Sequence, residues 1–407
     1  MSRGPSQGLQ RLGAPITEQR NWLIAIRAPC LGGGKLVRLL EAFGGIEALF
    51  SASDASLRSA GLDPETIRCL RKPDSDLLDL DQRWLESPSR HLVTWGSEGY
   101  PDLLAQVSCP PAALFLAGDP LTLLQPQIAI VGSRNPTAGG LDNARDFAGE
   151  VARRGFVVAS GLASGIDSAC HDGAMDAGGK TVAVTGTGLD EVYPPSSRRR
   201  AGRIARNGAL ISEFPPGTGA RREHFPSRNR IISGLSLGVL VIEAGLNSGS
   251  LITARLGSEQ GREVFALPGS IHNPMTKGCH RLIREGARLV ETVDEILEGI
   301  RPMAGDLANR LIARLSEDET AAVDKRGSKP KMPTGQHANG ASPESGAEHF
   351  DADYQRLLGE LGFDPKPVDR LVEQSGLTAR EVSAMLLMLE LRGVVEAHPG
   401  GAFSRKR

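Results

Sequence analysis

Between residues 127 and 290 the chain repeats a short apolar segment that ends in small polar residues and glycine. Six such segments occur, at residues 128–131, 156–159, 182–184, 209–211, 239–242 and 264–267. They are rich in Val and Ile and do not alternate with polar residues, which is typical of strands buried on both faces of a parallel sheet. Helix-like stretches lie between them, for example residues 141–154, which stop at Gly155. This alternation predicts a doubly wound, mostly parallel α/β sheet.

The ends of these segments show where a ligand would bind, because open α/β sheets bind ligands beyond the carboxyl ends of their strands. A dinucleotide fingerprint would need G-x-G-x-x-G after the first strand and an acidic residue after the second. The first loop, Gly132-Ser133-Arg134, has a single glycine, and the second strand ends in Ser160-Gly161 without an acid. The sequence therefore argues against a NAD-dependent oxidoreductase.

These loops are suited to bind an anion. Hydroxyl groups, glycines that allow close backbone approach and the helix N-termini that follow most of the loops all favour negative charge. The loop at residues 247–253 runs straight into an expected helix and resembles a phosphate cradle, although it lacks the lysine of a Walker motif. The residues that supply the hydroxyls and this cradle are Ser133, Ser160, Thr187, Ser248, Gly249, Ser250 and Thr253.

Arginine is concentrated in one part of the chain. Residues 198–230 contain nine arginines against two acidic residues, a net charge of +7 in a protein whose formal charge is −1. The planar guanidinium of arginine matches phosphate oxygens well, and a cluster of this size suits a ligand with several phosphates in a row, such as a polynucleotide. A single strand is favoured over a duplex, because the crevice at the strand ends is a narrow slot and not a broad convex face. Part of residues 198–206 is expected to be an ordinary solvated helix face. Arg228-Asn229-Arg230 should instead start a helix that points into the crevice, and one of the nearby aromatic residues could stack on a base. Those aromatic residues are Tyr193, Phe214 and Phe225.

Catalysis has little support. Asp167 and His171 are four residues apart and could form an acid–base pair on one helix face, but a capping Asp and a half-buried His are the favoured interpretation. The five cysteines are scattered without a C-x-x-C pair, so we expect neither a metal site nor a disulfide framework. No catalytic residue is predicted.

The flanking regions predict further domains. We expect disorder at residues 1–18, a helical domain at 19–90, the sheet domain at 91–302, a flexible linker at 303–353 and a winged helix at 354–407. In the helical domain a Gly32-Gly33-Gly34 hairpin could contact DNA, but a small bundle that packs on its neighbour is favoured. The third helix of the winged-helix region carries charges that cancel, which favours protein contact or weak DNA contact. No apolar stretch could cross a membrane, and the protein is expected to be cytoplasmic.

The motifs of the sheet region closely resemble the DprA (Smf) DNA-processing family, and the resemblance runs from about Trp95 to Gly299. The end domains resemble its helical SAM-like domain and winged helix. The motifs that carry the resemblance are Gly132-Ser133-Arg134, Ser160-Gly161-Leu162-Ala163-Ser164-Gly165-Ile166-Asp167, Gly186-Thr187-Gly188-Leu189-Asp190 with Tyr193-Pro194, Phe225-Pro226-Ser227-Arg228-Asn229-Arg230-Ile231-Ile232-Ser233-Gly234, Glu243-Ala244, Ser248-Gly249-Ser250-Leu251-Ile252-Thr253-Ala254 and Leu267-Pro268-Gly269.

The resemblance implies an extended Rossmann domain that binds single-stranded DNA, forms a homodimer and loads RecA onto incoming DNA during natural transformation, with no cofactor and no turnover. It implies that Arg134 grips a phosphate and that the segment after Gly278-Cys279-His280 contributes to the dimer face. Leu282, Ile283 and Val290 are the candidates for that face, with a place in the core as the alternative for each. Arg221 and Arg222 are expected as additional basic contacts. The expected phosphate-binding set is Gly132, Ser133, Arg134, Ser160, Gly161, Arg222, Arg228, Asn229, Arg230, Ser248, Gly249, Ser250 and Thr253.

Two other functions remain open on the sequence alone. One is a nucleotide-binding or nucleotide N-glycoside-hydrolysing enzyme related to phosphoribohydrolases, with Glu243 as the acidic residue, although Glu243 precedes the loop that it should follow. The other is a transcription regulator in which residues 354–407 bind an operator.

Overall fold

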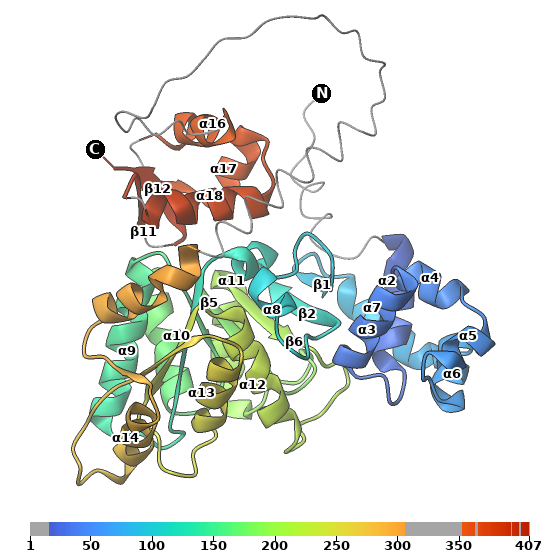
Figure 1. The fold of residues 1–407 in the computed structure, drawn as a ribbon, viewed down its shortest axis with the longest axis horizontal. Coiled ribbons are helices and arrows are strands. Elements are labelled where there is room, and N and C mark those ends of the chain that lie inside the picture. The colour runs from blue at the N-terminus through green and yellow to red at the C-terminus, as the bar shows by residue number, and fades with distance from the viewer. Residues whose placement is uncertain (1–15, 306–351, 363–364, 392, 399, 407) are drawn as a thin grey trace, which may run out of the picture. The chain divides into compact units, whose positions relative to one another are not determined.

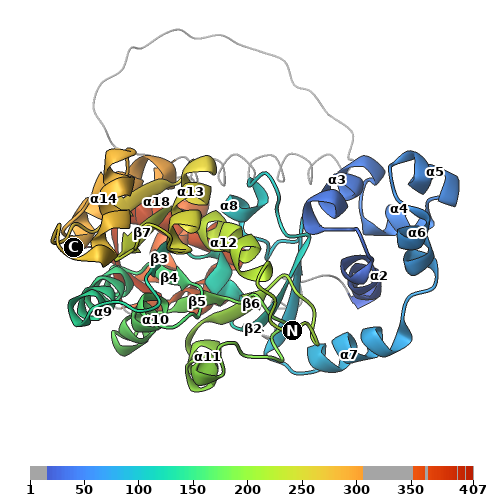
Figure 2. The same ribbon diagram turned by 90° about the horizontal axis from the view of Figure 1, so that it is seen from below.

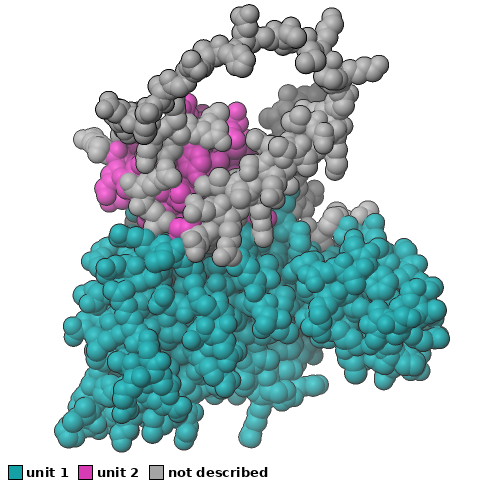
Figure 3. Space-filling model, in the orientation of Figure 1, with its two compact units in different colours: residues 1–304, 397–402 teal, residues 305–396, 403–407 magenta. Residues whose placement is uncertain are grey.

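The structure is a computed structural model that describes residues 16–305, 352–362, 365–391, 393–398 and 400–406. The expected linker at 303–353 and the expected disordered start lie almost wholly outside the described residues. The described chain forms two compact units (Figure 3), a large one that holds the sheet and the N-terminal helices and a smaller C-terminal one.

The large unit is built on a sheet of nine strands with the order β1-β2-β6-β5-β4-β3-β7-β8-β9. Figure 1 labels β1, β2, β5 and β6 of this sheet. Strands β3 to β9 are parallel, whereas β1 pairs antiparallel with β2 and β2 pairs antiparallel with β6. Their bounds are β1 Arg90–Thr94, β2 Ala113–Gly118, β3 Gln127–Gly132, β4 Val157–Ser160, β5 Thr181–Val184, β6 Ala209–Ser212, β7 Gly238–Ile242, β8 Glu263–Ala266 and β9 Arg288–Leu289. The predicted mostly parallel sheet and its six apolar strands are confirmed.

Helices cover both faces of this sheet. Figure 2 shows α9 (Ala138–Arg153), α10 (Ile166–Asp176) and α11 (Arg198–Asn207) on one face. On the other face lie α8 (Asp102–Ala105), α12 (His224–Leu235) and α13 (Ser250–Glu259). The remaining short helices are η1 Pro120–Leu124, η2 Pro195–Ser197, η3 Pro274–Thr276 and α14 Lys277–Arg284.

The strand order places a topological switch at β3. β3 pairs with β4 on one side and with β7 on the other, so the chain leaves β3 in one direction and returns to it from the opposite one. The loops after these three strands therefore diverge and leave a crevice at their carboxyl ends, where ligands of such sheets bind.

The N-terminal helices form a bundle that shares a core with the antiparallel edge of the sheet. Trp84 meets Phe115 of β2 edge-on, with ring centroids 5.8 Å apart. A Cβ at Gly33 would lie 3.0 Å from the Ala112 nitrogen, and one at Gly34 would lie 2.7 Å from the Cys109 sulfur. The glycine hairpin thus allows close packing on the sheet domain, as the favoured prediction had it. The helices are α2 Ile16–Arg27, α3 Gly33–Phe43, α4 Ile46–Ser51, α5 Asp54–Ser59, α6 Pro64–Arg71 and α7 Ser75–Leu85.

The C-terminal unit has the helices and hairpin of a winged helix, as predicted. Its three strands have the order β10-β12-β11. Val382, Leu386 and Leu389 of the third helix are buried in its core. The elements are α16 Ala352–Leu361, β10 Lys366–Pro367, α17 Val368–Ser375, α18 Ala379–Leu391, β11 Val395–His398 and β12 Ala402–Arg405.

Candidate functional site

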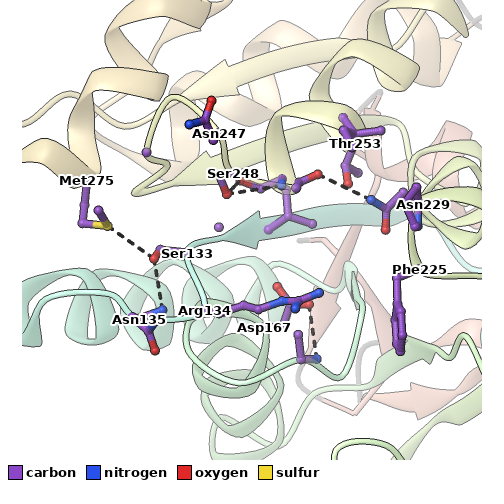
Figure 4. A pocket seen from close by; sticks show the side chains of 18 of the residues that line it. Ser133, Arg134, Asn135, Asp167, Phe225, Asn229, Asn247, Ser248, Thr253 and Met275 are labelled. Carbon is purple, nitrogen blue, oxygen red and sulfur yellow. Dashed lines mark hydrogen bonds between the residues drawn. The ribbon is translucent and has the colours of Figure 1, made fainter. Parts of the chain in front are cut away.

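A cavity of about 940 Å³ opens at the carboxyl end of β3, where the strand order switches. Its walls come from the loop after β3, the loop after β7, the first turns of α12 and the segment around Met275. Figure 4 shows Ser133 and Arg134 on one side of the cavity, with Ser248, Thr253 and Asn229 across from them. The predicted site residues that line this cavity are Gly132, Ser133, Arg134, Arg222, Arg228, Asn229, Ser248, Gly249, Ser250 and Thr253.

The loop after β3 is held by contacts that leave Arg134 free. Gly132 has no room for a side chain, since a Cβ there would lie 1.9 Å from the Ile242 carbonyl oxygen. The Ser133 amide donates to the Glu243 carbonyl at 2.7 Å, and the Ser133 hydroxyl accepts from the Asn135 amide at 3.1 Å. Arg134 is exposed at this turn and makes no ion pair within the described chain. A backbone fixed in this way presents an exposed cation beside the buried Ser133 hydroxyl.

The opposite wall is the loop that starts α13. The hydroxyls of Ser248 and Ser250 lie 2.7 Å apart, and the Ser250 amide donates to the Ser248 hydroxyl at 3.4 Å. Asn229 of α12 donates to the Gly249 carbonyl at 3.5 Å, which joins this loop to the neighbouring helix. The wall combines hydroxyl groups with the start of a helix, whose dipole favours an anionic ligand.

Arg228 forms the floor of the cavity rather than its rim. Its side chain is buried, and its guanidinium donates to the Val184 carbonyl at 2.8 Å. A Cβ at Gly161 would lie 2.0 Å from the guanidinium, so this glycine makes room for the arginine. Burial lowers the pKa of Arg228 to about 10, and the neighbouring Asp167 carboxylate opposes that shift. Arg228 and Arg134 therefore share one cavity, but Arg228 is already engaged by the protein.

Asp167 is the buried counter-charge of this floor. Its carboxylate accepts hydrogen bonds from the amides of Gly161 at 3.2 Å and Ala163 at 3.4 Å. Burial raises the pKa of Asp167, while the charge of Arg228 and the two amides act to lower it. Together these contacts hold the loop after β4 in place below the cavity.

The basic segment is divided between paired and exposed arginines. Arg200 and Arg203 pair with Asp172 at 2.9 and 3.2 Å, and Arg203 also pairs with Asp176 at 2.7 Å. Acids outside residues 198–230 thus neutralise part of the +7 charge, as expected of a helix face. Arg230, predicted to bind phosphate, is instead held by Glu213 at 2.7 Å and does not line the cavity. Arg222 reaches the cavity, whereas the exposed arginines outside its lining are Arg198, Arg199, Arg206 and Arg221.

Sequence reasoning missed part of the lining. Met275 accepts a hydrogen bond from the Ser133 hydroxyl at 3.5 Å, and Leu246 and Lys277 stand nearby in the wall. Tyr193 and Phe225, two of the three aromatic residues named from the sequence, do line the cavity, with ring centroids 5.3 Å apart. Residues 274–277 carry no local signal for this position, because only the pairing order of β3, β7 and β8 brings them to the cavity.

Two family models match this chain. Residues 91–301 match the family model described as DNA recombination-mediator protein A, and residues 340–401 match the DprA winged helix domain. The chain belongs to the DNA recombination-mediator protein A family. Family membership confirms the resemblance drawn from the sequence motifs.

Individual relatives agree with this assignment. The chain is 40% identical to Protein Smf of Escherichia coli over 80% of each chain. It is 46% identical to the DNA processing protein DprA of Bacillus subtilis, over 50% of this chain and 68% of the relative. The X-ray structure of DprA from Streptococcus pneumoniae aligns with a TM-score of 0.63 and 33% identity, over 69% of this chain and 97% of the other.

The residues considered for catalysis have structural roles. His171 is fully buried beside Thr181, with 2.7 Å between its Nδ1 and the hydroxyl, so it is more buried than predicted. Glu243 lies outside the cavity lining and accepts three hydrogen bonds, from the Thr137 amide and hydroxyl and from Asn273. Within the described residues, no group of three or more His, Cys, Asp or Glu side chains could hold a metal ion. In the same residues no helix is long and apolar enough to cross a membrane.

Ser160 and Gly161, which were predicted to bind phosphate, do not line the cavity. Ser160 is buried and donates to the Ile130 carbonyl at 2.7 Å, and Gly161 lies beneath the cavity beside Arg228. Val290, predicted at the dimer face, is fully buried within the single chain, so its side chain belongs to the core. Leu282 and Ile283 are half-buried on α14.

Proposed function

We propose that this protein binds single-stranded DNA in the cavity at the end of β3 and leaves the strand chemically unchanged. The observation that carries the proposal is the placement of the exposed Arg134, which has no ion pair within the described residues, opposite the hydroxyls of the Ser248–Ser250 loop at the start of α13. Phosphodiester oxygens accept hydrogen bonds from guanidinium and hydroxyl groups. The description of the family as recombination mediators is in keeping with a DNA ligand.

The shape of the cavity favours a single strand. Ser133 and Ser250 are buried at its walls, where the backbone of an intact duplex would not reach. The aromatic pair Tyr193–Phe225 and the exposed Leu246 offer apolar surface for a base or sugar beside the phosphate groups. Stacking on such surfaces requires an unpaired base.

Oligonucleotide affinity across a salt series tests this function. Each phosphate contact on a single strand contributes about 0.7 to the slope of log affinity against log salt. Arg134→Ala should weaken binding to every sequence and reduce the slope by about that amount. Arg206→Ala, which removes an exposed arginine outside the cavity lining, is the matched control and should change little. Wild-type binding by Arg134→Ala, or tighter binding of duplex than of single strand, would refute the proposal.

The proposal extends to the partners of the bound strand. As a recombination mediator the protein would act as a homodimer in natural transformation, protect incoming DNA from nucleases and load RecA onto it. The names of the Bacillus subtilis and Streptococcus pneumoniae relatives refer to DNA processing, which supports this role. The half-buried Leu282 and Ile283 are the residues proposed for the dimer face.

RecA loading and dimer formation are measured separately. Wild-type protein should shield an oligonucleotide from nuclease and accelerate RecA assembly on it, and Arg134→Ala should do neither. Leu282→Asp should shift the sedimenting species from dimer to monomer while the single chain stays folded. A wild-type protein that sediments as a monomer at all concentrations would remove the dimer from the proposal.

A further inference from the structure

The N-terminal helices hold the loop that leads into the cavity. Arg27 of α2 forms a two-pronged ion pair with Asp81 of α7, with distances of 2.6 and 2.7 Å. The same guanidinium also donates to the Pro216 carbonyl at 2.8 Å, in the loop between β6 and α12. Asp81 is fully buried and the Arg27 side chain is 14% exposed. A buried charge pair that bridges to a distant loop fixes that loop more firmly than an exposed contact would.

A second set of contacts holds the same loop. The Gly217 amide donates to Asp190 at 2.8 Å, and the Gly188 amide donates to the Thr218 carbonyl at 2.8 Å. Gly217 has a φ of +80° and lies under Leu80 of α7, whose Cδ2 would be 3.1 Å from a Cβ there. The tip of the loop, although Gly217 itself is exposed, is therefore held by contacts with α7 and with the loop after β5.

This loop ends at the cavity. Its first residues are tied to α12 by the Glu213–Arg230 ion pair and by Phe214, which stacks on His224 at 4.0 Å. Between this tip and the first turn of α12 lies Arg222, an exposed arginine that lines the cavity. Because the loop is held at residues 216–218 and again at α12, Arg222 can occupy only a limited range of positions.

We propose that Arg27 and Asp81 are positioning residues, which place Arg222 over the cavity through the Pro216 loop. The inference rests on the proposed DNA-binding function and names a role for the N-terminal helices in it. In this role α2 and α7 do not contact the DNA; they hold the Pro216 loop and thereby limit the positions that Arg222 can take over the cavity.

The test replaces the whole pair, because removal of one partner alone would leave an uncompensated buried charge. Arg27→Met combined with Asp81→Leu keeps the volume, and such apolar replacements of buried ion pairs are often neutral for folding. This variant should bind a single-stranded oligonucleotide roughly three- to tenfold more weakly, the size of a misplaced contact. In an Arg222→Ala background the same replacement should cause no further loss, since its effect passes through Arg222.

A matched pair lies elsewhere in the same helices. Arg71 pairs with Asp54 at 3.1 Å and donates to the Phe50 carbonyl at 2.6 Å, without contact to the Pro216 loop. Arg71→Met combined with Asp54→Leu should leave affinity within about twofold of wild type. A folded Arg27→Met/Asp81→Leu protein with wild-type affinity, or an equal loss in the Arg222→Ala background, would overturn the proposal.

A milder variant decides the matter if that protein does not fold. Arg27→Lys keeps a charge beside Asp81 but lacks the fork that reaches both Asp81 and Pro216. It should weaken binding in the wild-type background only, and unchanged binding would refute the positioning role. Arg134→Ala distinguishes failure of the positioning role from failure of the proposed DNA-binding function. If Arg134→Ala binds the oligonucleotide as wild type does, the assignment of DNA binding to the cavity fails. If Arg134→Ala binds weakly but the Arg27 and Asp81 variants bind as wild type does, only the positioning role fails.

Discussion

At the scale of single residues, Arg134 and Arg228 share a cavity but differ in what their loss would do. Arg228→Ala would remove a buried side chain, its hydrogen bond to the Val184 carbonyl and a positive charge that lowers the pKa of the buried Asp167, and it would empty the space beside Gly161. We expect the free energy of unfolding to fall by about 2–5 kcal/mol, as for other large-to-small changes at buried positions. Arg134→Ala, at an exposed position, should change it by less than about 0.5 kcal/mol. Urea denaturation measures both, and a fully stable Arg228→Ala protein would contradict the structural role of this arginine.

His171 should give the fold a dependence on acid pH. The Thr181 hydroxyl donates to the Val158 carbonyl at 2.6 Å, so His171 donates from Nδ1 and its buried Nε2 has no partner in the described chain. Burial, with a smaller effect from Arg200 and Arg228, lowers the pKa of His171 from 6.5 to about 3. Because the folded pKa lies below the unfolded one, the unfolded chain takes up the extra proton. The stabilisation is complete above pH 6.5 and is lost as the pH falls towards 3.

The size of that loss can be measured. Between about pH 6 and 4, the free energy of unfolding should fall by up to about 1.4 kcal/mol per pH unit through this residue. His171→Gln carries no titrating group and should have a correspondingly flatter profile, even if it is less stable at neutral pH. Parallel urea curves at several pH values give both slopes, and identical slopes would show that His171 is not responsible.

At the scale of elements, the glycines at the start of α3 differ in whether close packing requires them. Gly33 faces backbone atoms of residues 110–112 at 3.0–3.1 Å from a Cβ, whereas Gly32 has nothing within 4 Å and an ordinary φ of −65°. Gly33→Ala should therefore destabilise the protein by about 1–3 kcal/mol through overpacking. Gly32→Ala should be neutral or slightly stabilising. Thermal unfolding of the two variants compares them directly, and equal midpoints would argue against close packing here.

The elements were largely predictable from the sequence, whereas the roles of side chains were only partly so. Apolar runs such as 239–242 identify buried strands because burial on both faces leaves no polar alternation. The helix predicted at 141–154 begins earlier, at Ala138, because the Thr137 hydroxyl caps it by accepting from the Gly140 amide. Whether an arginine is free or paired depends on acids far away in sequence, as Arg200 with Asp172 shows. Sequence spacing carries no information about such pairs.

At the scale of the whole molecule, the two units can be assigned separate tasks. All residues that line the cavity fall between Val131 and Lys277, within the large unit. If the strand is bound there, removal of residues 354–407 should leave affinity within about twofold of the full chain, since independent sites contribute additively. A transcription regulator that reads DNA with its winged helix would instead lose binding altogether. The affinity of the truncated protein for single-stranded and duplex oligonucleotides, measured at equal salt, therefore distinguishes the two functions. Retained binding of the single strand assigns the DNA site to the sheet domain. Loss of that binding would assign the site to the C-terminal unit.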